Sequence, residues 1–197
     1  MRTRDYTFDY EKQPSRAMFK YKQAFIRNDQ ERYMTFLNNV LQGKATLHAD
    51  NVAPYELIRP YMTWNWNGPS LETMSKSEKD ALNASWASLL DFCSDEDMLA
   101  VVDTSGSMHS SYGLPAAVAL SLGLYLAEHN KGRFRNHFIE FSERPQLIRL
   151  KGETFVDKLR YILTFDEIAD TNLEAVFQLI LCVAVKNKLC LLYTSDA

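Results

Sequence analysis

Residues 98–107, Met-Leu-Ala-Val-Val-Asp-Thr-Ser-Gly-Ser, place the tightest constraint on the fold. The run from Met98 to Val102 is short, apolar and rich in β-branched residues, which is typical of a strand buried on both faces of a parallel sheet. It ends at Asp103, and only small or oxygen-bearing residues follow as far as Ser107. Open α/β sheets bind ligands at the carboxyl ends of their strands, so this loop is predicted to lie at a binding edge.

The loop after this strand offers donor atoms of one chemical kind. The carboxylate of Asp103 and the hydroxyls of Ser105 and Ser107 are hard oxygen donors, which suit a small divalent cation with octahedral coordination. We therefore expect a site for Mg²⁺ or Mn²⁺. The structural alternative is a Ser/Gly turn in which Asp103 caps the following helix.

This Asp-x-Ser-x-Ser pattern, between a strand and a long helix, resembles the metal-ion-dependent adhesion site of von Willebrand factor A (vWA) domains. The resemblance assigns Asp103, Ser105 and Ser107 to the first metal loop and Thr171, at the start of a helix expected over 172–185, to the second. It also implies an Asp from a third loop, and an acidic group of a partner protein that completes the coordination of the metal. Thr171 can equally serve as a helix cap.

The first 97 residues predict a helical region. Apolar residues at three- and four-residue spacing indicate helices over 15–28, between Asp29 and Gly43, over 54–61 and over 79–92. Ser75 or Ser77 is expected to cap the last of these helices, and its inward-facing residues are expected to be Leu82, Trp86, Leu89 and Leu90. Asp29 is expected to cap the second helix and Gly43 to end it. Trp64 and Trp66 are expected to anchor a loop to a neighbouring surface.

The fold class expected from these patterns is α/β: a helical N-terminal region (1–97) followed by a partial Rossmann-like vWA domain (98–189). After the first strand we expect a long helix over 113–130, two strands over 134–141 and 145–150, and a short helix over 155–163. Pro145 suggests an edge strand, and Ser142-Glu-Arg a hairpin turn. The vWA resemblance implies a mostly parallel sheet flanked by helices.

The last eight residues, 190–197, resemble a translated sequencing-adapter read-through and are expected to be a non-native tail. The natural chain is then expected to continue beyond Lys188, with the third metal loop outside the present sequence. Asp196 is the only remaining acid and is not assigned as a ligand. The alternative is a genuine strand over 189–193.

The composition of the chain indicates in which compartment it acts and which classes of function it disfavours. Three widely spaced cysteines favour a reducing cytoplasm. The first residues lead into no apolar segment of a secretory signal, and no apolar run reaches membrane-spanning length, so we expect a cytoplasmic protein that does not insert in a membrane. A net charge of −3 disfavours a general nucleic-acid binder. We do not expect an enzyme, because a phosphohydrolase with Asp103 as nucleophile would need an acid where Ser105 stands.

The expected function is metal-dependent binding of a protein partner that presents an acidic residue. The alternative is RNA binding, because the helical-plus-vWA layout also resembles the Ro ribonucleoprotein and TROVE proteins. It is further similar to an uncharacterised family of bacterial, fungal, plant and viral proteins, through stretches such as 22–26 and 172–181. Residues 12–32 carry six basic side chains against two acidic ones, and Tyr21 or Tyr33 would stack on bases. Both tyrosines fall on the apolar stripe, which favours an ordinary solvated helix face.

Overall fold

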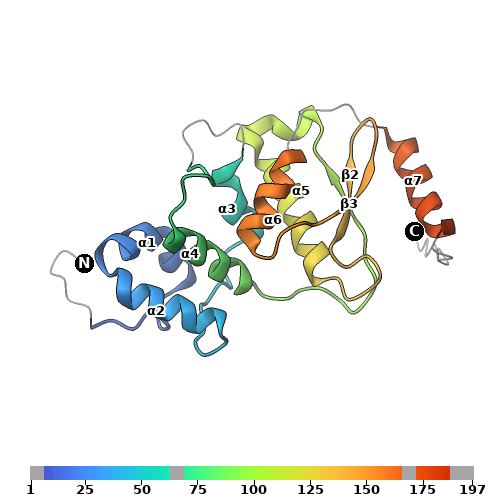
Figure 1. Cartoon of the computed structure of the whole chain (residues 1–197). Coiled ribbons are helices and arrows are strands. Elements are labelled where there is room, and N and C mark those ends of the chain that lie inside the picture. Colours follow the sequence, from blue (N-terminus) through green and yellow to red (C-terminus); the bar gives the residue numbers. More distant parts are fainter. Residues whose placement is uncertain (1–6, 63–68, 166–171, 187–197) are drawn as a thin grey trace.

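The structure, a computed structural model, describes residues 7–62, 69–165 and 172–186 (Figure 1). Its helices are α1 (Ser15–Asn28), α2 (Gln30–Leu41), α3 (Pro54–Ile58), α4 (Lys76–Ala87), α5 (Ser110–His129), α6 (Phe155–Ile162) and α7 (Leu173–Lys186). Three 3-10 turns are η1 (Arg59–Tyr61), η2 (Gly106–His109) and η3 (Leu163–Phe165). The strands are β1 (Ala100–Asp103), β2 (His137–Phe141) and β3 (Gln146–Arg149). The described part is therefore a mixed α/β structure, as predicted; the Rossmann-like vWA assignment goes further than this.

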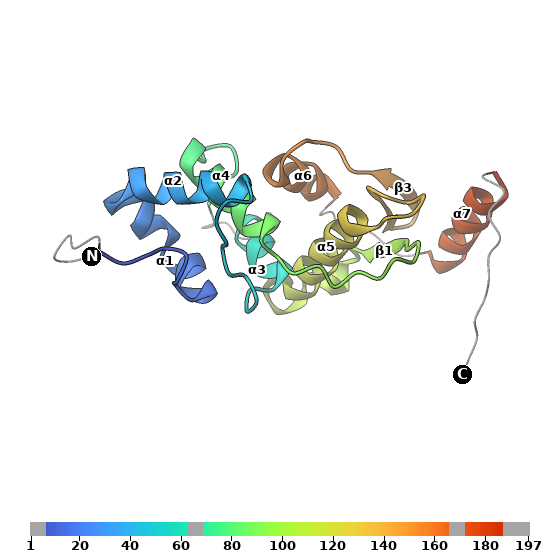
Figure 2. The same cartoon turned by 90° about the horizontal axis from the view of Figure 1, so that it is seen from below.

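The helical hairpin of α1 and α2 closes on an aromatic cluster at one end of the molecule (Figure 2). The ring of Tyr10 lies 5.2 Å, centroid to centroid, from those of Phe25 and Tyr33. Asp29 stands at the predicted cap position of α2, but its side chain makes no capping hydrogen bond. Its buried carboxylate instead accepts from the hydroxyl of Tyr10 at 2.8 Å and from Arg32 at 3.1 Å. The capping prediction is wrong because the Asp29 side chain is directed toward Tyr10 and Arg32, which both donate to its Oδ2, and not toward the first N–H groups of α2.

Helix α4 begins at a capping box in which Ser75 and Glu78 bond each other's backbone N–H groups. The helix ends at Ala87, five residues earlier than predicted. The chain then leaves the helix axis, because the hydroxyl of Tyr125 on α5 donates to the carbonyl of Leu90 at 2.5 Å. Leu90, expected to face inward, is consequently exposed. The loop that holds Trp64 and Trp66 lies outside the described residues.

The three described strands form one sheet in the order β1-β2-β3. Strands β1 and β2 are parallel, with Asp103 beside Phe141, whereas β2 and β3 form the predicted antiparallel hairpin. The described strands thus show one pairing of each kind rather than a mostly parallel sheet. The expectation that β1 is buried on both faces is also wrong: Val102 is 2% exposed but Val101 is 44% exposed.

Helix α5 covers one face of β1 at close range. A Cβ atom on Gly123 would lie 2.3 Å from Cγ2 of Val102, so the glycine is what permits this approach. By length and composition α5 and the turn before it could cross a membrane, but half of the relevant window is buried inside the protein. That burial is typical of a core helix.

One hydrophobic core joins the N-terminal helices to the sheet region. Helices α3 and α4 pack on α5 and α6, and the shared core includes Leu57, Ile58, Leu82, Trp86, Leu120, Leu159 and Ile162. The ring of Trp86 stacks on Phe155 at 4.1 Å with an interplanar angle of 12°. The expected division of the chain at residues 97 and 98 stays a prediction, and both sides of it contribute to this core.

Candidate metal-binding loop

The loop that follows β1 holds three of the four predicted ligands close together. Asp103 is the last residue of β1, and its Oδ1 accepts the backbone N–H of Ser105 at 2.8 Å. This hydrogen bond folds the loop back over the strand end, as short Asp-x-Ser segments commonly do. The hydroxyls of Ser105 and Ser107 form a hydrogen bond with each other, and their oxygens lie 3.1 Å apart.

That oxygen separation fits the donor geometry of a small cation. Two adjacent octahedral ligands at about 2.1 Å from Mg²⁺ are themselves about 3.0 Å apart. Ser105 and Ser107 therefore already stand at the spacing of one edge of a magnesium coordination shell. Ser107 is exposed and Asp103 is partly exposed, so the donors are open to solvent and to a partner.

The fourth predicted ligand, Thr171, lies outside the described residues. Its neighbour Asn172 is described, and the backbone N–H of Asn172 donates to the carbonyl oxygen of Ser142 at 3.3 Å. Ser142 directly follows β2, whose last residue Phe141 pairs with Asp103. The start of α7 is thus held at the edge of the sheet from which the Asp103 loop also leaves.

Two features of this edge were not anticipated from the sequence. The side chain of Thr104, inside the loop, is fully buried and its Oγ1 has no hydrogen-bond partner among the described residues. The segment Ser111-Tyr112-Gly113 adopts left-handed backbone angles, with φ of 52°, 56° and 64°, so that the regular part of α5 starts after it. Such angles cost about 1–2 kcal/mol for each non-glycine residue, and no local sequence pattern marks them.

The donor set is made mainly of hydroxyls. Within residues 7–62, 69–165 and 172–186, no group of three or more His, Cys, Asp or Glu side chains is placed to hold a metal ion. The candidate loop contributes one carboxylate, that of Asp103, and two serine hydroxyls. Few charged ligands imply a weak site that keeps bound water or gains a carboxylate from elsewhere.

The basic face proposed for RNA is only partly available. Tyr33 is 2% exposed and its burial raises the pKa of its hydroxyl, so it is not placed to stack on a base. Tyr21 is 49% exposed, with the ammonium of Lys20 5.4 Å from its ring centroid. Lys22 is turned toward the protein, and burial lowers its pKa. Arg16 lies 3.9 Å from the carboxylate of Glu56.

Two family models match this chain, one on each side of the expected boundary. Residues 3–99 are similar to a family described as domain of unknown function DUF2828, and residues 97–191 to one described as domain of unknown function DUF7788. An uncharacterised protein of Acanthamoeba polyphaga mimivirus is 29% identical over 194 residues, which cover 92% of this chain and 32% of the relative. The chain thus spans about a third of the length of the curated relative that it matches. No solved structure matches it.

Proposed function

We propose that this protein is a metal-dependent binding module of vWA type, which uses a divalent cation to capture an acidic side chain of a protein partner. Asp103, Ser105 and Ser107 would hold the cation, with Thr171 as the donor from the second loop. The observation that carries the proposal is one turn in which the Asp103 carboxylate accepts the backbone N–H of Ser105 while the hydroxyls of Ser105 and Ser107 lie 3.1 Å apart, hydrogen-bonded to each other.

The arrangement of the sheet supports this reading. The Asp103 loop follows β1, and Asn172, just before α7, is hydrogen-bonded to Ser142 at the end of the adjacent parallel strand β2. Such strand ends are where α/β folds collect ligand-binding side chains. A donor set with one carboxylate leaves a bound divalent cation with net positive charge, which favours an additional anionic ligand. The side chains of this chain position the ion and leave one face of it to the partner.

Calorimetric titration of the 197-residue chain with Mg²⁺ and Mn²⁺ tests the cation site. We expect saturable binding that Ser105→Ala and Ser107→Ala each weaken by about tenfold or more, since each removes a direct oxygen donor. Ser94→Ala, in the linker before β1, is the matched control and should bind as the parent does. Equal affinity in all four proteins would overturn the proposal.

A second candidate, binding of structured RNA, rests on the exposed Lys20–Tyr21 pair and the neighbouring Arg16 and Arg27 on α1. Phosphate contacts by these side chains predict an RNA affinity that falls steeply as salt is raised. Filter binding between low and high salt measures this slope. Lys20→Gln combined with Arg27→Gln should flatten it; an unchanged slope would exclude α1 as the RNA surface.

A further inference from the structure

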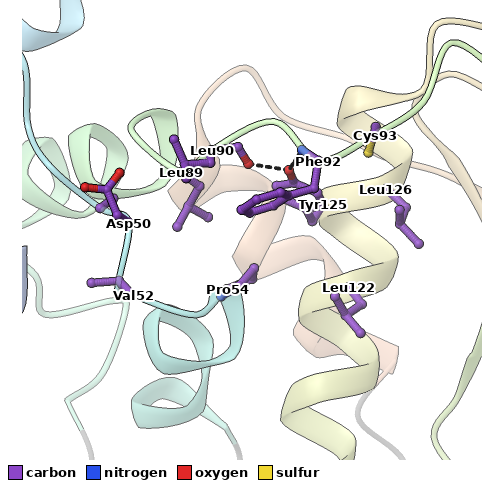
Figure 3. Close-up of a pocket in the computed structure, with 11 residues that line it drawn as sticks. Asp50, Val52, Pro54, Leu89, Leu90, Phe92, Cys93, Leu122, Tyr125 and Leu126 are labelled. Carbon is purple, nitrogen blue, oxygen red and sulfur yellow. Dashed lines mark hydrogen bonds between the residues drawn. The ribbon is translucent and has the colours of Figure 1, made fainter.

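An apolar cavity of about 240 Å³ lies between the segment that leads into α3, the linker after α4 and the side of α5 (Figure 3). Its lining comes from both family-matched parts of the chain: Val52, Pro54 and Leu89 from one, and Leu122, Tyr125 and Leu126 from the other. Ligand sites commonly form at such junctions. The cavity is separate from the metal loop, since neither Asp103 nor the two serines line it.

The linker that forms one wall is pinned in place. The hydroxyl of Tyr125 donates to the carbonyl of Leu90 and accepts the backbone N–H of Phe92 at 2.8 Å (Figure 3). The polar end of Tyr125 is thereby satisfied, and burial raises its pKa. The wall is therefore a preformed part of the structure, and the rest of its lining is mainly apolar.

Large apolar side chains are exposed to solvent at the opening of the cavity. Phe92 is 79% exposed, Leu122 is 45% exposed and Leu90 is 44% exposed. All three also line the cavity, so exposed apolar side chains surround its opening. Apolar patches rimmed by polar residues are typical of protein-binding sites, whereas a site for a small molecule encloses its ligand.

The rim of this surface is acidic. Asp50 lines the cavity, and Asp91 lies between Leu90 and Phe92 on the linker. Among the described residues neither carboxylate lies within ion-pair distance of a basic side chain. The ammonium of Lys131, which binds the neighbouring Asp95 at 2.5 Å, is close enough to Asp91 to interact with it electrostatically. Burial raises the pKa of the Cys93 thiol on the cavity wall, and the negative charge of Asp91 raises it further. The complement of this surface is an apolar group flanked by positive charges.

We propose that this cavity docks a basic amphipathic helix of a partner protein, whose large apolar side chain enters the cavity while its Lys or Arg residues face Asp50 and Asp91. An apolar cavity of about 150 Å³ holds a benzene ring, so 240 Å³ accommodates an aromatic or branched aliphatic anchor. Helix-in-groove recognition uses such an anchor with apolar neighbours at helical spacing. Phe92, Leu90 and Leu122 provide the surface that those neighbours cover.

The test uses a fluorescently labelled peptide of about 18 residues, long enough to form a helix, with Leu and Trp on one face and Lys on the other. Anisotropy titration against the 197-residue chain should give saturable binding. Leu122→Glu and Phe92→Ser should each weaken it by about tenfold or more, as expected for residues at the centre of an interface. Leu181→Glu, at a leucine on α7 that is also exposed, is the matched control and should leave binding unchanged.

Charge is tested separately. A peptide with Glu in place of Lys should bind at least about tenfold more weakly. In the double variant Asp50→Asn, Asp91→Asn, binding of the original Lys peptide should depend less on salt concentration. Leu122→Ala serves as a milder variant if circular dichroism shows that Leu122→Glu is unfolded. Equal binding by the Leu122 variants and Leu181→Glu, equal binding of the acidic peptide, or a cavity that takes up a naphthalene dye but no peptide would each overturn the proposal.

Discussion

The indole N–H of Trp86 donates to the carboxylate of Glu128 at 2.5 Å, which joins α4 of the helical region to α5 of the sheet region. The other oxygen of the same carboxylate accepts from the ammonium of Lys158 on α6. The side chains of Glu128 and Lys158 are only 15% and 18% exposed. One buried acid therefore links three helices that come from both halves of the chain.

Replacing Glu128 should destabilise the whole described fold. In Glu128→Ala the ammonium of Lys158 stays mostly buried without its counter-charge, and the indole of Trp86 loses its acceptor. Breaking such a pair from one side typically costs about 3–5 kcal/mol. Urea denaturation followed by tryptophan fluorescence measures the loss.

The double variant Glu128→Ala, Lys158→Met separates this charge effect from lost packing. Removing both charges should recover part of the loss, because no unpaired ion remains buried. If the double variant is as unstable as the two single changes added together, the ion pair does not couple α5 to α6.

Gly123→Ala should lower the melting temperature, although alanine is the better helix former by about 1 kcal/mol. The added methyl group would meet Val102 on β1, a short branched side chain that cannot move aside. Overpacking of this kind costs about 1–3 kcal/mol. Val102→Ala in the same chain should restore part of the stability, as scanning calorimetry would show. A Gly123→Ala protein that melts higher than the parent would contradict the close packing of α5 on β1.

The elements of this fold follow well from local patterns, but their burial does not. Helical spacing and the Ser75 capping signal located α4, and the paired apolar runs located the β2–β3 hairpin. The same patterns placed Leu90 and Val101 inside, where the structure leaves them exposed. Periodicity says which side chains are apolar, whereas burial depends on which other segments cover them.

For the candidate site too, the local pattern predicts one part and leaves another undetermined. Asp103, Ser105 and Ser107 lie within five residues of one another, so one turn is enough to bring them together, and the pattern alone predicts it. The second loop is distant in sequence, and Thr171 lies outside the described residues. Its neighbour Asn172 is held at the end of β2, a placement that depends on tertiary structure and not on the local pattern. The left-handed backbone at Ser111 has no counterpart in local propensity and came only from the structure.

Acidification should destabilise the protein through the capping boxes at the start of α4 (Ser75 and Glu78) and of α6 (Thr154 and Asp157). Hydrogen bonds from Gln23 and Ser75 lower the pKa of Glu78, and those from Thr154 lower that of Asp157. A carboxylate whose pKa is lower in the folded than in the unfolded chain stabilises the fold at pH values above its unfolded-state pKa of about 4. That contribution is lost as the pH falls through the folded values.

Urea midpoints measured between neutral pH and pH about 3 should therefore decrease with acid. Glu78→Gln, which keeps a side chain able to cap Ser75, should flatten part of this decrease. A parent and a variant with the same pH profile would show that Glu78 is not a source of the acid sensitivity.

The proposed cation site uses two loops only if Thr171 donates its hydroxyl oxygen to the cation, and this can be tested by thermal stability. A cation bound only by the native fold raises its stability, by about 2.7 kcal/mol at a hundredfold excess over its dissociation constant. Saturating Mn²⁺ should therefore raise the melting temperature of the parent, and chelation should reverse the shift. Thr171→Val removes one hydroxyl at nearly constant shape and should reduce the shift, whereas Thr164→Val, whose hydroxyl bonds the carbonyl of Tyr161, should keep it. If both variants respond to Mn²⁺ as the parent does, while Asp103→Asn does not, the cation is held by the first loop alone and α7 supplies no ligand.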